Sequence, residues 1–209
     1  MHATICDYIA DTVQNSIEAG ASRIDATLTE NGEIVEIAVK DNGKGMDEET
    51  LSHAWNPFYT EQGKHDKRRV GLGLPLLRQT VEATGGSFSI ESAPGKGTEI
   101  IYSFGATHPD TPPLGNVAEA VVSLMNYASN CDFRFTHSRC ADSYSISRGE
   151  LEEALGDLRD ASNLAFAKAF LKDQESDLEA RETFATITFS STKYSAAARG
   201  RDTAETAKE

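Results

Sequence analysis

The sequence is short of several residue types, and each shortage narrows what the protein can be. Its 209 residues include three cysteines, an odd number without a Cys-x-x-Cys pair. Such thiols give no disulfide framework and suit a reducing compartment. No apolar run approaches the roughly 18 residues that a membrane-spanning helix needs, and the first residues lack the basic and apolar segments of a secretion signal. We therefore predict a cytoplasmic protein with no membrane partner.

Basic residues are also scarce. The chain has 20 Lys and Arg against 33 Asp and Glu, which gives a formal net charge of −13. Duplex DNA attracts basic surfaces, so this balance argues against a nucleic-acid partner but not against a nucleotide, which needs only a few local donors. With 39% apolar and 25% charged residues, the composition is that of a globular chain with one sizeable core or two small ones.

One string of residues could contribute metal ligands, namely Cys131, His137 and Cys140. A structural zinc site uses four ligands at closer spacings, and no fourth ligand is evident in the sequence. We therefore do not predict a metal centre from this string.

Residues 4–19 have the pattern of an amphipathic helix. An apolar side chain recurs at every fourth position, at Ile5, Ile9, Val13 and Ile17, and Gly20 is placed to end the helix. Asp11 and Asn15 lie one turn apart on the other side, so both can address one point in space. That face is either solvated or lines a cleft in which Asn15 binds Mg²⁺ and Asp11 orients a water molecule.

The next two segments, 24–28 and 35–39, alternate apolar and polar residues around an Asn31-Gly32 turn and predict a β-hairpin. The second strand leads to the turn Asp41-Asn42-Gly43-Lys44-Gly45-Met46. A carboxylate at the end of a strand can accept a hydrogen bond from an exocyclic amine, and glycines permit close backbone approach. Asp and Gly also make ordinary turns, so this motif alone is a weak signal.

A long loop is predicted over residues 55–70. It concentrates basic residues, at Lys64, Lys67, Arg68 and Arg69. It is either a solvated loop or a lid whose cations meet phosphate oxygens. Gly71-Leu72-Gly73-Leu74 then opens a predicted helix that ends near Ala83. Glycines at a helix start leave backbone N–H groups free to face an anion.

The second half of the chain begins after a proline-rich segment, residues 107–115, which we predict to be a linker after an N-terminal domain of residues 1–106. Residues 116–180 are predicted to be mainly helical, with a hairpin near 132–147. Their apolar residues fit a core better than a cofactor site, and a docking surface for a partner stays open. Residues 181–209 are rich in Ser, Thr, Ala and charge, which predicts a largely disordered tail.

Together these segments resemble the GHKL superfamily of ATPases and kinases, which includes gyrase-type topoisomerases, heat-shock chaperones, sensor histidine kinases and mismatch-repair ATPases. Residues 11–21 look like the N box in its mismatch-repair form. Residues 41–46 match the first glycine box, and Asn56-Pro-Phe58-Tyr-Thr matches the F box of histidine kinases. The second glycine box and its strands are similar to residues 71–77, Gly85-Gly86 and 92–98. The likeness covers residues 4–105.

The resemblance implies an α+β Bergerat fold, a two-layer sandwich of a mixed sheet with helices on one face, which binds ATP. By position, Asp41 would bind the adenine amine with support from Thr98 through water. Asn15 would hold Mg²⁺ against the phosphates. The other ligand-binding positions that it implies are Gly43, Gly45, Met46, Phe58, Lys64, Gly71, Leu72, Gly73 and Leu74. Of these, Phe58 would anchor the lid and the glycines would offer clearance and backbone donors.

The sequence departs from the family in two ways that bear on activity. Position 11 is Asp, whereas the hydrolytic members usually carry a Glu as general base. None of the five histidines lies in a His-Glu/Asp-x-Lys pattern, so the chain is not a self-contained sensor kinase. We predict Mg²⁺-dependent ATP hydrolysis or phosphoryl transfer to a separate protein, with a homodimer left open. A nucleotide-gated interaction module without turnover is the alternative, and a degenerate domain that no longer binds nucleotide is a third.

Overall fold

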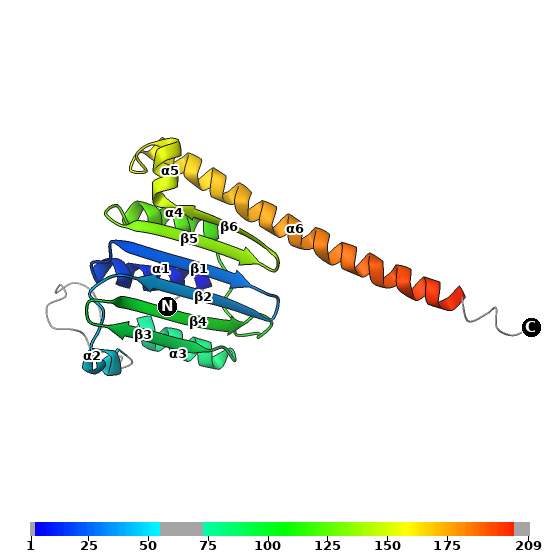
Figure 1. The fold of residues 1–209 in the computed structure, drawn as a ribbon, viewed down its shortest axis with the longest axis horizontal. Coiled ribbons are helices and arrows are strands. Elements are labelled where there is room, and N and C mark those ends of the chain that lie inside the picture. The colour runs from blue at the N-terminus through cyan, green and yellow to red at the C-terminus, as the bar shows by residue number, and fades with distance from the viewer. Residues whose placement is uncertain (1–2, 55–72, 203–209) are drawn as a thin grey trace, which may run out of the picture.

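The computed structural model of the protein describes residues 3–54 and 73–202, and the side chains as far as Arg181. Figure 1 shows a six-stranded sheet in front of a layer of helices. The strand order is β3-β4-β2-β1-β5-β6. The strands are β1 (Arg23–Glu30), β2 (Ile34–Asp41), β3 (Phe88–Ala93), β4 (Gly97–Gly105), β5 (Asp132–Arg139) and β6 (Asp142–Ser147). The helices are α1 (Ile5–Glu18), α2 (Glu48–His53), α3 (Gly73–Ala83), α4 (Val117–Tyr127), α5 (Arg148–Leu155) and α6 (Ala161–Asp202).

The sheet is mixed, because β1 and β5 run parallel while every other neighbouring pair is antiparallel. Helices α1, α3 and α4 lie behind it in Figure 1, on one face. This arrangement confirms the predicted α+β sandwich with a mixed sheet. The other face of the sheet carries the alternate, mostly polar residues of the strands and, among the described residues, none of these three helices.

Helix α1 starts where the sequence predicts because Thr4 caps it. The Thr4 Oγ1 accepts from the Asp7 backbone N–H at 3.2 Å, and the Asp7 carboxylate accepts from the Thr4 N–H at 2.9 Å. This reciprocal pair satisfies two donors that a helix start leaves open. The apolar side of α1 is buried, with Ile5 1%, Ile9 3% and Val13 0% exposed. Burial of that stripe turns the opposite side of the helix, with Asp11 and Asn15, away from the sheet.

The two halves of the chain share one core. Buried Ile24 and Ile37 of the first half belong to the same apolar cluster as Phe133, Phe135 and Met125 of the second. The predicted hairpin near 132–147 is present as β5 and β6. What the sequence did not predict is that β5 pairs with β1 along its whole length and so extends the first sheet.

The proline-rich segment contacts the start of α1 directly. The backbone carbonyls of Pro113 and Leu114 accept from the N–H groups of Ile5 and Cys6 at 2.9 and 3.0 Å. Residues 107–115 therefore hold the first turn of α1 instead of running through solvent. Whether residues 1–106 and 116–180 fold as separate domains stays a prediction.

Helix α6 is longer than the sequence predicted, since it continues from Ala161 to Asp202 instead of ending near 180. It starts beside α5 and extends beyond the sheet (Figure 1). Residues 203–209 lie outside the described ranges, and the disordered tail over 181–209 stays a prediction. A polar composition favours disorder, but it does not interrupt a helix in a stretch free of proline.

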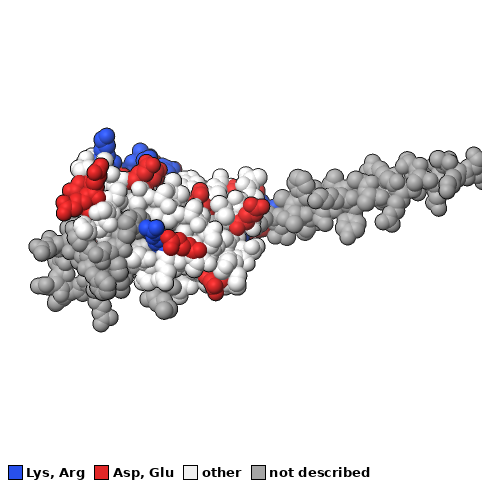
Figure 2. All heavy atoms as spheres, turned by 90° about the horizontal axis from the view of Figure 1, so that it is seen from below, with Lys and Arg blue, Asp and Glu red and all other residues white. Residues whose placement is uncertain are grey.

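No helix within the described ranges has both the length and the apolar character needed to cross a bilayer. Seen from below in Figure 2, the coloured part of the surface carries Lys and Arg in small groups next to Asp and Glu. This face therefore shows scattered cations among the described residues and not a continuous basic surface.

Candidate functional site

The centre of the candidate site is Asp41, the last residue of β2. Asp41 is buried, with an exposed fraction of 8%. The Ser16 hydroxyl donates to its Oδ2 at 2.7 Å. Its Oδ1 accepts from the backbone N–H groups of Gly43 at 2.8 Å and Thr98 at 3.3 Å. Donors from α1, from the turn after β2 and from β4 therefore fix one carboxylate in place.

Two glycines let the turns around Asp41 pack closely. Gly45 has φ +65° and Gly97 has φ +84°, the left-handed region that glycine adopts most readily. A Cβ on Gly45 would overlap the Ala93 carbonyl, and a Cβ on Gly97 would overlap the carbonyl of Asp41 itself. Only glycine fits at either position, so the turn after β2 lies directly against the turn between β3 and β4.

A second set of contacts joins Met46 and Thr98 to the same place. The hydroxyl of Ser92 accepts from the Met46 backbone N–H at 2.8 Å and lies 2.9 Å from the Thr98 hydroxyl. Thr98 thus supports Asp41 through its own backbone N–H, in addition to any water that the family resemblance implies. Gly43 is less tightly confined, since a Cβ there would lie 3.0 Å from the Asp41 carboxylate and from Ala19.

Asp11 and Asn15 lie one turn apart on α1, Asp11 half-buried and Asn15 exposed. A Cβ on Gly73, the first residue of α3, would overlap Oδ2 of Asp11. The first glycine of α3 therefore lets an acidic side chain of α1 approach the start of α3, where the helix dipole favours negative charge. Asn15 is exposed on the next turn towards Asp41. The N-box and second-glycine-box segments, far apart in sequence, meet here.

The remaining predicted positions divide into two groups. Leu74 is half-buried and packs against the core. Phe58, Lys64, Gly71 and Leu72 lie outside the described residues, so their roles stay predictions.

A hollow of about 270 Å³ lies beside this region, lined in part by Lys40, Asp41 and Glu99. Lys40 and Glu99 alternate to the face of the sheet opposite the Asp41 side chain and pair with each other at 3.1 Å. The hollow takes in these two side chains together with Ser92 and Thr98, and neither Asp11 nor Asn15 lines it. We do not assign the nucleotide to it.

Sequence reasoning missed Ser16 and Ser92, which hold Asp41 and Thr98. A signal existed for Ser16: it lies three residues after Val13 and therefore on the sheet-facing side of the helix, where a small hydroxyl needs a partner. Ser92 had no comparable signal, because its partners depend on how the two turns pack.

The residues fit an adenine nucleotide with a divalent cation. Asp41 offers a fixed acceptor for an amine, the glycines leave room for close approach, and the amide oxygen of Asn15 is of the kind that Mg²⁺ prefers. The start of α3 offers backbone donors suited to phosphate.

Comparison with known proteins identifies the class. Residues 4–108 match the family model described as "Histidine kinase-, DNA gyrase B-, and HSP90-like ATPase". The match takes in half of the chain, and the protein belongs to this family. Its first half is accordingly an ATP-binding domain of the histidine-kinase-like kind.

Curated relatives point to sensor kinases in particular. Sensor histidine kinase YvrG of Bacillus subtilis (strain 168) is 34% identical over 84 residues, which are 40% of this chain and 14% of that protein. Sensor histidine kinase YxdK of the same organism is 29% identical over 100 residues, 46% of this chain and 31% of that protein. Sensor histidine kinase ZraS of Klebsiella oxytoca is 40% identical over 68 residues, 32% of this chain and 14% of that protein. The similarity thus spans less than a third of each relative.

Among solved structures, the N-terminal domain of a DNA repair protein is similar, with a TM-score of 0.52 and 15% sequence identity. The superposition covers 78% of this chain and 59% of that one. This likeness concerns the fold alone, and its coverage extends beyond the half of the chain that the family model matches.

Proposed function

We propose that the protein binds ATP together with Mg²⁺ around Asp41 and transfers the terminal phosphoryl group to a separate protein or to water. The observation that carries this proposal is the buried Asp41 carboxylate, fixed by Ser16, Gly43 and Thr98. Such a pre-oriented acceptor selects a ligand that presents an amine at that point. A fixed acceptor also rejects ligands that lack the amine, because the buried carboxylate would then lose a partner.

In this proposal Asn15 holds the cation and the first turn of α3 receives the phosphates. When bound, Mg²⁺ would neutralise the negative charge of the phosphates, which is the main requirement of phosphoryl transfer. Phe58 and Lys64 are proposed to belong to a lid over the nucleotide. Because the cation and the backbone donors act locally, a net acidic protein can still bind a triphosphate.

Asp11 is the proposed group that orients an acceptor hydroxyl or a water molecule. It lies against Gly73 at the start of α3 and one turn from Asn15. The kinship with sensor histidine kinases supports transfer to a protein, with the phosphoacceptor on another chain. The mismatch-repair form of the N box supports hydrolysis, although position 11 holds Asp and not the usual Glu, and both acceptors are retained. A cytoplasmic location and a homodimer stay predictions.

The second candidate is a nucleotide-gated interaction module that binds ATP without turnover. What favours it is the direct contact of residues 107–115 with α1, because a helix that bears nucleotide ligands is thereby joined to the second half of the chain. Incubation of the purified protein with radiolabelled ATP separates the candidates. Free labelled phosphate, or label on an added partner, supports an enzyme; tight binding with neither supports the module.

Binding itself is tested by calorimetry with Mg²⁺ and ATP on Asp41→Asn and on the control Asp25→Asn. Asp25 is a half-buried aspartate of β1 that pairs with Arg23 at 2.9 Å, on the face of the sheet opposite the helices α1, α3 and α4. A hydrogen bond to a charged group contributes about 1.5–3 kcal/mol, so Asp41→Asn should weaken ATP binding roughly 10- to 100-fold. Equal affinity in both variants would remove Asp41 from the site.

A further inference from the structure

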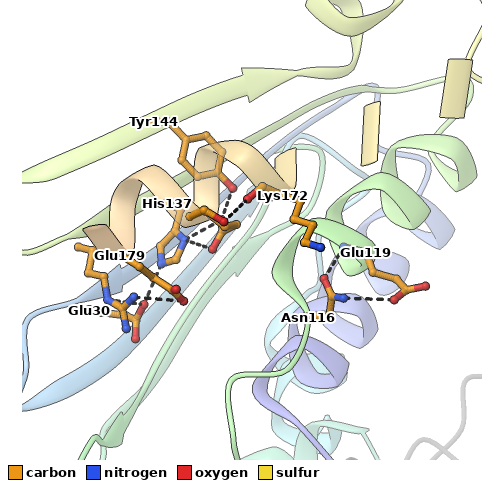
Figure 3. A network of polar contacts seen from close by, with 10 residues as sticks. Glu30, Asn116, Glu119, His137, Tyr144, Lys172 and Glu179 are labelled. Atoms are coloured by element: carbon orange, nitrogen blue, oxygen red, sulfur yellow. Dashed lines mark hydrogen bonds and ion pairs between the residues drawn. The ribbon is translucent and has the colours of Figure 1, made fainter. Parts of the chain in front are cut away.

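A buried charge network joins α6 to the sheet at the end remote from Asp41. Figure 3 shows His137 of β5 between carboxylates of different elements. Its Nε2 lies 3.0 Å from Oε1 of Glu30 on β1, and its Nδ1 lies 3.0 Å from Oε1 of Glu175 on α6. The Tyr144 hydroxyl of β6 donates to the same Glu175 oxygen. His137 is 1% exposed, so water competes little for these contacts.

The geometry suits a charged imidazole between two carboxylates. A neutral ring has one N–H and one lone pair, and the lone pair would face a carboxylate across 3.0 Å. An imidazolium ring donates on both sides. Arg139 lies 3.5 Å from Glu30, so two cations then balance the Glu30 and Glu175 carboxylates. When His137 loses its proton, the network holds one cation for two carboxylates, and one buried negative charge is left without a positive partner.

The pKa shifts of His137 and Glu30 agree with a charged imidazole beside an ionised carboxylate. Burial by itself lowers the pKa of His137, but hydrogen bonds and charges from Glu175 and Glu30 outweigh it and hold the pKa above its ordinary value. Burial likewise raises the pKa of Glu30, yet His137 and Arg139 outweigh that effect and leave it lowered.

The network lies within the surface by which α6 packs on the body of the protein. Glu175 falls between Leu171 and Leu178 along the helix, and these side chains are 0% and 4% exposed. Leu171 precedes Glu175 by one turn and Leu178 follows it by almost one, so all three lie on one side of α6. A change of charge at His137 therefore acts at the middle of the buried stripe.

Titratable groups from α1, β1, β5, β6 and α6 itself face the network. These groups are Cys6 from α1, Glu30 from β1, Arg139 from β5, Tyr144 from β6, and Glu175 and Glu179 from α6. Glu179 lies 3.7 Å from Arg139 and is 69% exposed. Its side chain is thus at the rim, whereas Glu175 is 17% exposed.

We propose that His137 is a protonation-controlled latch for α6. With its proton, the ring ties Glu30 of β1 to Glu175 and holds α6 on the sheet; without it, the segment of α6 around Glu175 is released. The inference does not depend on nucleotide binding. Because the pKa of His137 is raised in the folded state, the latch is closed below that pKa, as long as Glu30 stays ionised, and it opens as pH rises through the His137 pKa.

Hydrogen exchange on the full chain tests the latch. Protection of the amides of residues 164–181 is measured from about pH 6 to about pH 10 and corrected for intrinsic exchange, while an NMR titration follows the His137 ring. We expect protection to fall at least about tenfold as the ring loses its proton, with α3 unchanged as an internal reference. Constant protection of α6, or a ring that titrates at or below the ordinary value of 6.5, would overturn the proposal.

Two variants separate the latch from a merely structural ion pair. Glu175→Gln removes one negative partner of His137, so the ring should titrate at lower pH and the loss of protection should move with it. Glu179→Gln, one turn further along α6, should leave both curves close to those of the unchanged protein. If Glu175→Gln kept the original ring titration and exchange profile, the latch would be refuted.

Discussion

The hydroxyl of Ser16 donates a 2.7 Å hydrogen bond to Oδ2 of Asp41, which joins helix α1 to the end of strand β2. Ser16 is 4% exposed, so no solvent replaces it if it is removed. The helix that carries Asp11 and Asn15 thereby fixes the orientation of the carboxylate at the centre of the site.

Replacement of this hydroxyl tests its positioning role. Ser16→Ala leaves a buried carboxylate oxygen without a donor, a loss of about 1–3 kcal/mol, so ATP affinity should fall roughly 5- to 100-fold. Calorimetry with Mg²⁺ and ATP measures it. The control is Ser89→Ala on the exposed face of β3, which should bind as the original protein does. Unchanged affinity in Ser16→Ala would contradict the assigned role.

Gly97 offers a test of close backbone packing. Gly97→Ala adds a Cβ that would overlap the carbonyl of Asp41, and we expect a lower free energy of unfolding and weak ATP binding. Gly32→Ala is the matched control: its φ of +86° is almost the same as the +84° of Gly97, but nothing lies within 4 Å of its added Cβ. Left-handed strain alone costs about 1–2 kcal/mol. In urea unfolding Gly97→Ala should therefore lose more than Gly32→Ala, and equal losses would argue against the overlap.

The three thiols should differ in reactivity. Burial raises the pKa of Cys6 to about 12, with added effects of Glu175 and Asp7, and burial also raises that of Cys131 to about 11. Cys140 is exposed at the turn between β5 and β6. Because the thiolate is the reactive form, Ellman's reagent near pH 8 should label one thiol in the folded protein and all three in denaturant. Cys140→Ala should abolish the rapid reaction; persistence would place a second accessible thiol in the fold.

Stability should depend on pH through Glu30 and His137 in opposite directions. The lowered pKa of Glu30 gives a contribution that is present above its ordinary value of 4.5 and lost as pH falls through the folded value. The raised pKa of His137 gives one that is complete below 6.5 and lost as pH rises through the folded value.

Both contributions are complete together between these two reference values, where the difference in unfolding free energy between the original protein and His137→Gln should be largest. Urea unfolding over a pH series measures it. If the difference in unfolding free energy between the two proteins kept growing as pH rose above this window, the assigned direction of the His137 contribution would be contradicted.

Much of the nucleotide region could be predicted because local signals agree there. The four-residue recurrence of apolar side chains fixed α1, and the Asn31-Gly32 turn with its alternating flanks fixed β1 and β2. Motif order then placed Asp41 and Thr98 together, and the structure joins them by a hydrogen bond.

What could not be predicted depends on contacts between distant segments. The pairing of β1 with β5 joins residues that are more than 100 positions apart in the sequence. The sequence of each strand contains no signal that identifies the strand it pairs with. The contact of His137 with Glu175 likewise arises only after α6 has packed. Ser92 lies where two turns pack together, so the residues next to it in the sequence give no indication of its role.

The parallel pairing of β5 with β1 affects any attempt to produce the N-terminal half of the chain by itself. A protein cut within residues 107–115 would lose β5, and the edge of β1 that pairs with it, from Arg23 to Glu30, would have no neighbouring strand, while the other edge stays paired with β2. It would also uncover the part of α1 that α4 covers. Exposed strand edges pair with other chains, so such a fragment should self-associate, and its nucleotide binding would not represent that of the whole chain.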